Sequence, residues 1–334
     1  GIILSYIPAL LYYGQSFVQS FFTNRRMFEL VAFPILIALQ PSERELRSAL
    51  YSFSILYLIV SLFVTFLAPD WVPKPDDSAL LEEGDIIYAL PGIRHVAFAF
   101  IFALQRVIKD NNSRNMGWAI FEFLLLFLIQ NRTSLLAAIA IMMFLVYKMK
   151  MGPRKLFLIA VGSVFVLLMA VYTAGQWGHL YQETVEQLLN PDYNRNKAFV
   201  YMFSRRSVLQ YLLGSGFISA NVNSVIYDLQ ENGIYHSDVG LVGMWHQYGV
   251  IPVLVILVMM CKGFFGRKSF LVKAAAIYIL VGIPTMSYYA LGESLLWLSI
   301  YLYIYYSDGL PSFRDDHVTL KKVGWSGRRF RSLV

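Results

Sequence analysis

Arginines stand at several places where a predicted apolar helix meets a polar segment. Arg94 begins one apolar run, and Arg132 lies in a polar turn between two others. Arg195, Arg205 and Arg206 lie in a long polar stretch further along the chain. A planar guanidinium binds phosphate through paired donors. Each arginine alone could be a snorkelling anchor or part of a local ion pair, but several on one face indicate an anionic ligand.

A histidine near the start of a later apolar run is the candidate proton acceptor. His236 stands in the sequence Tyr235-His236-Ser237-Asp238. Imidazole titrates near neutral pH and can act as a general base, with Asp238 as an orienting partner. A single histidine at such a position can also be an interface residue, and that alternative stays open. His, Asp and Glu show no metal-site spacing, and the chain has no P-loop, nucleophile elbow or dinucleotide fingerprint. We therefore expect no metal and no cofactor.

The composition excludes most soluble classes. Hydrophobic residues make up 57% of the 334 residues and charged residues 15%, whereas soluble domains run at about 45–50% and about 25%. The single cysteine, Cys261, excludes internal disulfides and cysteine-based metal sites. We expect an all-α polytopic membrane protein, in which the net charge of +7 reports loop charges rather than nucleic-acid binding.

Apolar runs predict about ten membrane-spanning helices. The second predicted span is short and holds Pro34. The chain begins at Gly1, inside the first apolar run, so we interpret the chain as a fragment that lacks earlier spans. The runs cover residues 2–22, 27–40, 46–68, 93–109, 115–131, 133–148, 155–174, 238–261, 269–287 and 289–306.

Charge orients these spans and divides the chain. About two thirds of the 28 Lys and Arg residues fall in alternate connections and in the tail, which by the positive-inside rule puts both ends in the cytoplasm. We expect an N-terminal transmembrane bundle (1–174), a large outer loop with helical pieces at 180–189 and 197–213 (175–237), C-terminal transmembrane helices (238–306) and a basic cytoplasmic tail (307–334). The aromatic residues of the large loop favour an ordered, functional segment.

The order of these motifs over about 90–306 resembles the superfamily of O-antigen ligases and O-antigen or exopolysaccharide polymerases. The similar segments are Pro91–Arg94, Asn131–Ser134, Ser204–Ser207, Leu213–Phe217 and the stretch from His236. Ligases typically have His-Asn at the histidine, whereas His236-Ser237-Asp238 looks more like the exopolysaccharide polymerase branch.

The resemblance implies a metal-independent glycosyltransferase at the outer side of a bacterial inner membrane. Its donor would be a glycan on a polyprenyl diphosphate. Arg94, Arg132 and one or more of the loop arginines would bind the diphosphate, and His236 would be the base. The expected partners are this lipid-linked oligosaccharide, the bilayer and other membrane proteins of polysaccharide assembly, with no nucleic acid.

Two other functions remain open besides a polymerase. A ligase would transfer the glycan to a lipid A core instead of to another repeat unit. A flippase or transporter would use carboxylates inside its spans, for which Glu122 and Glu293 are the candidates, but it predicts an internal repeat that the sequence does not show.

Overall fold

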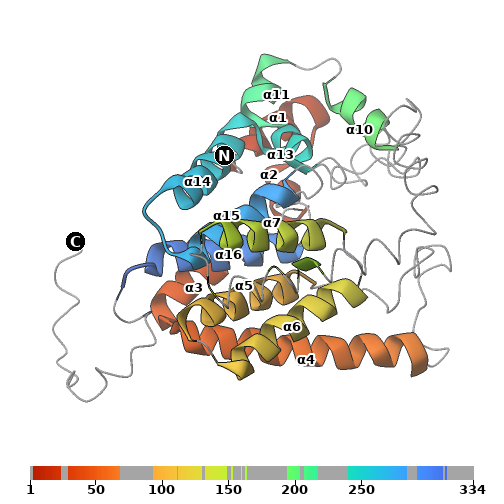
Figure 1. Cartoon of the computed structure of the whole chain (residues 1–334). Helices are drawn as coiled ribbons and strands as arrows, with labels where there is room; N and C mark the ends of the chain where they lie inside the picture. Colours follow the sequence, from red (N-terminus) through yellow and green to blue (C-terminus); the bar gives the residue numbers. More distant parts are fainter. Residues whose placement is uncertain are drawn as a thin grey trace.

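The computed structural model describes residues 3–23, 29–67, 93–110, 112–129, 132–148, 152, 159, 162–163, 194–203, 207–216, 240–283, 292–310 and 313. Every regular element in these ranges is a helix, which confirms the all-α class (Figure 1). After a 3-10 turn (Ile3–Ser5), the helices are α1 (Tyr6–Tyr13), α2 (Phe17–Thr23), α3 (Ala32–Leu39), α4 (Glu43–Leu67), α5 (Ile93–Lys109), α6 (Ser113–Leu128), α7 (Arg132–Lys148), α10 (Asn194–Phe203), α11 (Val208–Leu213), α13 (Gly240–Tyr248), α14 (Val250–Phe265), α15 (Phe270–Gly282) and α16 (Gly292–Ser307).

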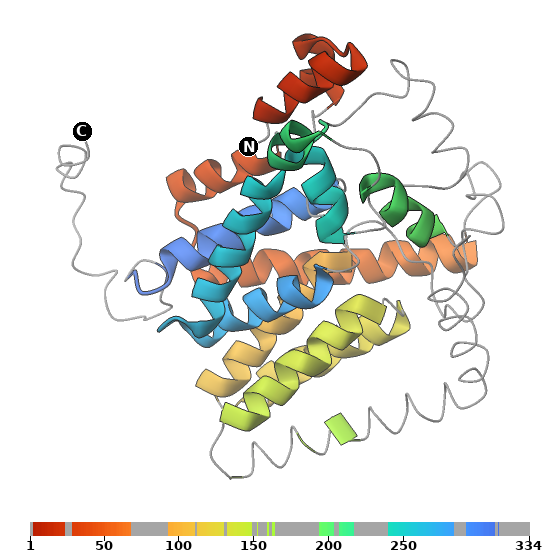
Figure 2. The same ribbon diagram turned by 90° about the horizontal axis from the view of Figure 1, so that it is seen from above.

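Helix α5 is the centre of the bundle. It packs against α4, α6, α7, α15 and α16, and all its residues from Arg94 to Gln105 are buried. Figures 1 and 2 show α4 running along this group, with α1, α10 and α11 to one side. A helix that is apolar around most of its circumference is stable only when neighbours cover it all round. Aromatic packing fixes α5 to its neighbours, since the Phe98 ring lies 5.0 Å from that of Trp297 and 5.6 Å from that of Tyr278, between centroids.

Polar contacts gather the helix ends at one end of the bundle, which we call the Glu43 end. The buried Glu43 carboxylate accepts from Lys109 Nζ at 2.7 Å and Gln105 Nε2 at 3.1 Å, and so joins the start of α4 to the end of α5. The Ser269 backbone N–H donates to Asp308 Oδ2 at 3.1 Å, and so joins the start of α15 to the end of α16. A bond from the Glu43 backbone N–H to the Phe313 carbonyl (3.3 Å) links the two pairs.

The opposite end, which we call the Arg94 end, holds the start of α5. The Ser134 and Tyr278 hydroxyl groups lie 3.3 Å apart there, joining the start of α7 to the last turns of α15. The Leu241 backbone N–H donates to the Ile283 carbonyl at 3.0 Å, which adds the start of α13. Helices α4, α5, α6, α7, α15 and α16 therefore alternate in direction between the two ends.

Among the described residues, one helix is long and apolar enough to cross a membrane, Glu43–Phe66. Only 22% of its most apolar window is buried, so it presents a largely apolar surface outward. Extended apolar surfaces of this kind mark contacts with lipid or with partners. The other apolar helices in the described ranges are shorter, and the predicted set of ten spans is not confirmed.

Two predicted spans are each broken into two helices. Within 2–22, α1 ends at Gly14, whose φ of 67° is left-handed, and α2 begins after Ser16. The Ser16 hydroxyl accepts from the Gln19 backbone N–H, and the Gln19 side chain accepts from the Ser16 backbone N–H, which caps α2 at a fixed residue. A hydropathy average over the run does not register this break, because apolar residues flank the short Gly14-Gln15-Ser16 segment on both sides.

The second break divides the predicted span 238–261 at Gly249. Its φ of 81° ends α13, and α14 begins at the next residue. The predicted span 155–174 lies almost entirely outside the described residues. The predicted helical piece 180–189 of the large loop lies entirely outside them.

Candidate active site

Arg94 lies in the first turn of α5 and is 6% exposed. Its neighbour His95 is also buried, with the ring centroid 5.0 Å from that of Tyr57 and 6.3 Å from that of Trp297. A charged side chain in such apolar surroundings is costly unless it interacts with polar or anionic groups. The predicted phosphate ligand Arg94 is therefore buried in the first turn of α5 rather than extended freely into solvent.

Arg132 is the first residue of α7, and the structure describes its backbone but not its side chain. Ser134, two residues later, contacts the Tyr278 hydroxyl, and the Tyr278 ring packs on Phe98, one turn after Arg94. The first turns of α5 and α7 are thus connected through α15 at the Arg94 end. This Ser134–Tyr278 contact could not be predicted from the sequence, because Tyr278 stands in an otherwise apolar run.

The predicted large loop reaches this part of the molecule through α10. Arg195 is the second residue of α10, and its side chain lies outside the described residues. Ala198 and Met202 of the same helix are buried and pack with Val242 near the start of α13. Arg205 and Arg206 also lie outside the described residues, between the end of α10 and Ser207.

Ser207 starts the next piece of the loop, α11, with a capping box. Its hydroxyl accepts from the Gln210 backbone N–H at 3.2 Å, while Gln210 Oε1 accepts from the Ser207 backbone N–H at 3.1 Å. Two orphan donors are satisfied reciprocally in this way, so α11 has a defined first residue directly after the arginine pair. The predicted single helical piece 197–213 is therefore two helices.

The Leu-Gly-x-Gly segment after α11 is bound to the end of α13. The Ser215 backbone N–H donates to the His246 carbonyl at 2.7 Å, and the Gly216 N–H donates to the Gln247 carbonyl at 2.9 Å. Trp245 Nε1 donates to the Tyr211 carbonyl at 2.8 Å. The loop is thus fastened to the helix that follows His236 in the chain.

Two glycines make this close approach of backbones possible. A Cβ on Gly214 would overlap the Gln247 backbone, and a Cβ on Gly249 would overlap the Leu212 carbonyl. Both glycines also have left-handed φ angles, 85° and 81°, which side chains disfavour. In the sequence, Gly214 and Gly216 are recognisable only as a turn signal. The contact of Gly249 with this turn was not predicted.

The predicted base and its partner lie outside the described residues. His236 and Asp238 precede Gly240, where α13 begins and where Leu241 is bound to Ile283 at the Arg94 end. The other histidine of this region, His246, is 5% exposed and packs inside the bundle.

The described residues contain no group of three or more His, Cys, Asp or Glu side chains that could hold a metal ion. Of the two carboxylates considered for transport, Glu122 is fully buried in α6, and the Glu293 side chain lies outside the described residues. Chemically, the described part of the Arg94 end offers a buried guanidinium, paired hydroxyl groups and a backbone junction between loop and bundle.

The chain was compared with protein-family models, with characterised proteins and with solved structures, and none of these matches it.

Proposed function

We propose that this protein is a polysaccharide polymerase of a bacterial inner membrane, which joins lipid-linked repeat units at the outer side. One observation carries the proposal: the described segments next to Arg94, Arg132, Arg195 and His236 pack on one another around α13 and the Arg94 end. The first and the last of these positions, Arg94 and His236, are 142 residues apart in the chain. A single site built from these four positions requires such a convergence of their neighbouring segments at one end of the bundle.

The proposed reaction needs two kinds of group, an electrostatic clamp and a base. The bond between the anomeric carbon of the donor glycan and the diphosphate oxygen breaks, and the electron pair leaves with the polyprenyl diphosphate. An acceptor sugar hydroxyl forms the new bond to that carbon and loses its proton to His236. Arg94, Arg132 and the loop arginines stabilise the charge that develops on the leaving diphosphate, and Asp238 orients the imidazole.

The apolar exterior of the helices suits a donor that is carried by a lipid. Ile59 and Phe63 of α4 are exposed, as are Leu254 and Val258 of α14. Apolar surface of this kind makes favourable contacts with acyl and prenyl chains. The lipid-linked donor can therefore reach the Arg94 end from within the bilayer, while the acceptor arrives from water. Because the clamp is made of arginines, this chemistry requires no metal or nucleotide from the protein.

Deletion of the gene in its host tests the proposal through the glycans that remain on the polyprenyl carrier. A polymerase predicts that long carrier-linked chains disappear and single repeat units accumulate at the outer side. Full-length carrier-linked polymer would instead indicate a ligase, and single units trapped at the inner side would indicate a flippase. Either of the last two results would contradict the polymerase.

A further inference from the structure

A basic pocket lies at the Glu43 end, on the side of the bundle opposite the candidate active site. It has a volume of about 590 Å³ and is formed by the first turns of α4, the end of α5 and the start of α6. Four arginines line it: Arg44, Arg47, Arg106 and Arg114. From the sequence alone these arginines are predicted only to set the orientation of the spans, because they belong to three different helices.

The charges of the pocket do not balance. Among the described residues one carboxylate lines it, that of Asp110, which is half exposed and lies 3.4 Å from an Arg106 guanidinium nitrogen. The buried Glu43 carboxylate behind the wall is shared between Arg47, at 3.8 Å, and Lys109, at 2.7 Å. An excess of fixed guanidinium groups around one cavity favours an anion within it.

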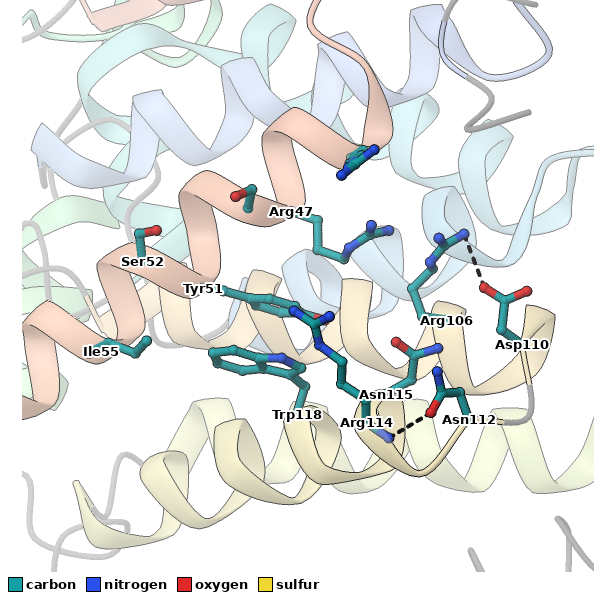
Figure 3. Close-up of a pocket in the computed structure, with 12 residues that line it drawn as sticks. Arg47, Tyr51, Ser52, Ile55, Arg106, Asp110, Asn112, Arg114, Asn115 and Trp118 are labelled. Atoms are coloured by element: carbon teal, nitrogen blue, oxygen red, sulfur yellow. Dashed lines mark hydrogen bonds and ion pairs between the residues drawn. The ribbon is translucent and has the colours of Figure 1, made fainter. Parts of the chain in front are cut away.

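Arginine side chains from three helices line the same cavity. Figure 3 shows Arg47 extending from α4 toward Arg106, whose guanidinium contacts Asp110, and Arg114 extending from α6 toward the Tyr51 and Trp118 rings. The guanidinium fork matches the oxygens of a phosphate, so several such forks around one cavity favour that anion as its ligand. The start of α6 lines the pocket as well, so the positive end of that helix dipole adds to the attraction.

An aromatic pair gives the pocket a rigid wall. The Tyr51 and Trp118 rings stack with centroids 4.2 Å apart and planes within 9°, and so hold α4 against α6 (Figure 3). Stacked rings restrict the separation of the two helices that carry Arg47 and Arg114. The site is therefore built before any ligand arrives, which lowers the entropic cost of binding.

We propose that this pocket binds a phosphate or diphosphate group, with the headgroup of an anionic membrane lipid as its source. Ile55 lines the pocket and is exposed, and the exposed side chains of Ile59, Leu62 and Phe66 continue from it along one face of α4. A headgroup phosphate among the arginines leaves its acyl chains on this apolar face. The inference does not depend on glycosyl transfer, since the pocket is at the other end of α5 from Arg94.

Native mass spectrometry of the purified full chain tests the site with three probes: phosphatidylglycerol, phosphatidylcholine and inorganic diphosphate. The variant replaces Arg47, Arg106 and Arg114 by Lys, which keeps every charge that sets orientation but removes the guanidinium forks. We expect wild-type protein to bind phosphatidylglycerol more tightly than phosphatidylcholine, and the triple variant to lose about tenfold or more in affinity for phosphatidylglycerol. Arg267→Lys, an exposed change at the same end but outside the pocket, should leave this affinity unchanged.

The remaining outcomes also decide the question. Diphosphate binding that is lost in the triple variant, without a preference between the two lipids, would support the phosphate site and assign it to a soluble ligand. Equal phosphatidylglycerol affinity in the wild type and in the triple variant would overturn the site and leave the arginines as orientation charges. If the triple variant does not fold, Arg114→Lys alone, at an exposed position, carries the same comparison with a smaller expected loss.

Discussion

At the scale of single residues, the proposed reaction depends on a base for the acceptor hydroxyl. His236→Ala should slow polymer formation by about 10²–10⁴-fold, the usual contribution of general-base catalysis. His236→Gln should not restore it, because an amide cannot take up the proton. The measurement is product length by mass spectrometry on matched amounts of membrane protein. His246→Ala is the control, since His246 is buried and should act through packing alone. Polymer at the wild-type rate from His236→Ala would remove the base assignment.

The arginines make a separate prediction about charge and geometry. Arg132→Lys and Arg94→Lys keep the positive charge but lose the paired donors, so polymer formation should fall about tenfold or more, since a hydrogen bond to a charged group is worth about 1.5–3 kcal/mol. The rates should be compared at equal levels of inserted protein, with the exposed Arg267→Lys as the matched control. Near-normal polymer from both the Lys and the Ala variants would make these residues anchors of their helices.

At the scale of elements, the junction between the loop and α13 depends on glycine. Gly249→Ala should lower the melting temperature of the protein, because a left-handed φ alone costs about 1 kcal/mol and the new Cβ meets the Leu212 carbonyl. Gly117→Ala is a matched control on α6, where the added Cβ has no neighbour within 4 Å. That change should stabilise the protein by about 0.5–1 kcal/mol. Equal melting temperatures for the two variants would contradict the junction.

A second element-level prediction concerns the contact between α4 and α5. Glu43→Ala removes the acceptor of both Lys109 and Gln105 and should lower the free energy of unfolding by about 1–3 kcal/mol. The lower half of that range is expected, since the Lys109 side chain is 41% exposed and partly solvated. Glu45→Ala, two residues later, breaks only an exposed capping interaction with Ser42 and should cost less. Denaturant titration in detergent compares the two, and a larger loss for Glu45→Ala would refute the assigned role of Glu43.

Helix prediction from the sequence worked where apolar runs are bounded by charge, and it failed where glycine interrupts them. The predicted runs 46–68, 93–109 and 133–148 correspond closely to α4, α5 and α7. Gly14 and Gly249 break their runs through left-handed backbone angles, which hydropathy does not register. The basic pocket was also not predicted from the sequence. Its arginines belong to three helices, and the packing of α4 on α6 through Tyr51 and Trp118 is a tertiary contact that the sequence pattern does not indicate.

At the scale of the whole molecule, the alternation of helix directions and the positive-inside rule together predict which positions face outward from the cell. In a Cys261→Ser background, Val208→Cys on α11 should react with a membrane-impermeant thiol reagent in intact cells, and Ser113→Cys at the start of α6 should react only after lysis. Both positions are exposed in the structure, so burial does not limit the reaction. The reverse pattern would invert the topology and place the proposed site on the wrong side for a lipid-linked donor.

The central claim is that the chain itself transfers glycan from a lipid diphosphate to a sugar hydroxyl. The most direct measurement is incubation of the purified protein with a synthetic polyprenyl-diphosphate repeat unit, in the presence of a metal chelator, with a mass readout of the products. We expect products that grow by whole repeat units, with release of polyprenyl diphosphate, and growth that is about 10²-fold or more slower with His236→Ala. An unchanged donor mass with folded wild-type protein, or equal growth with His236→Ala and Arg132→Ala, would contradict it.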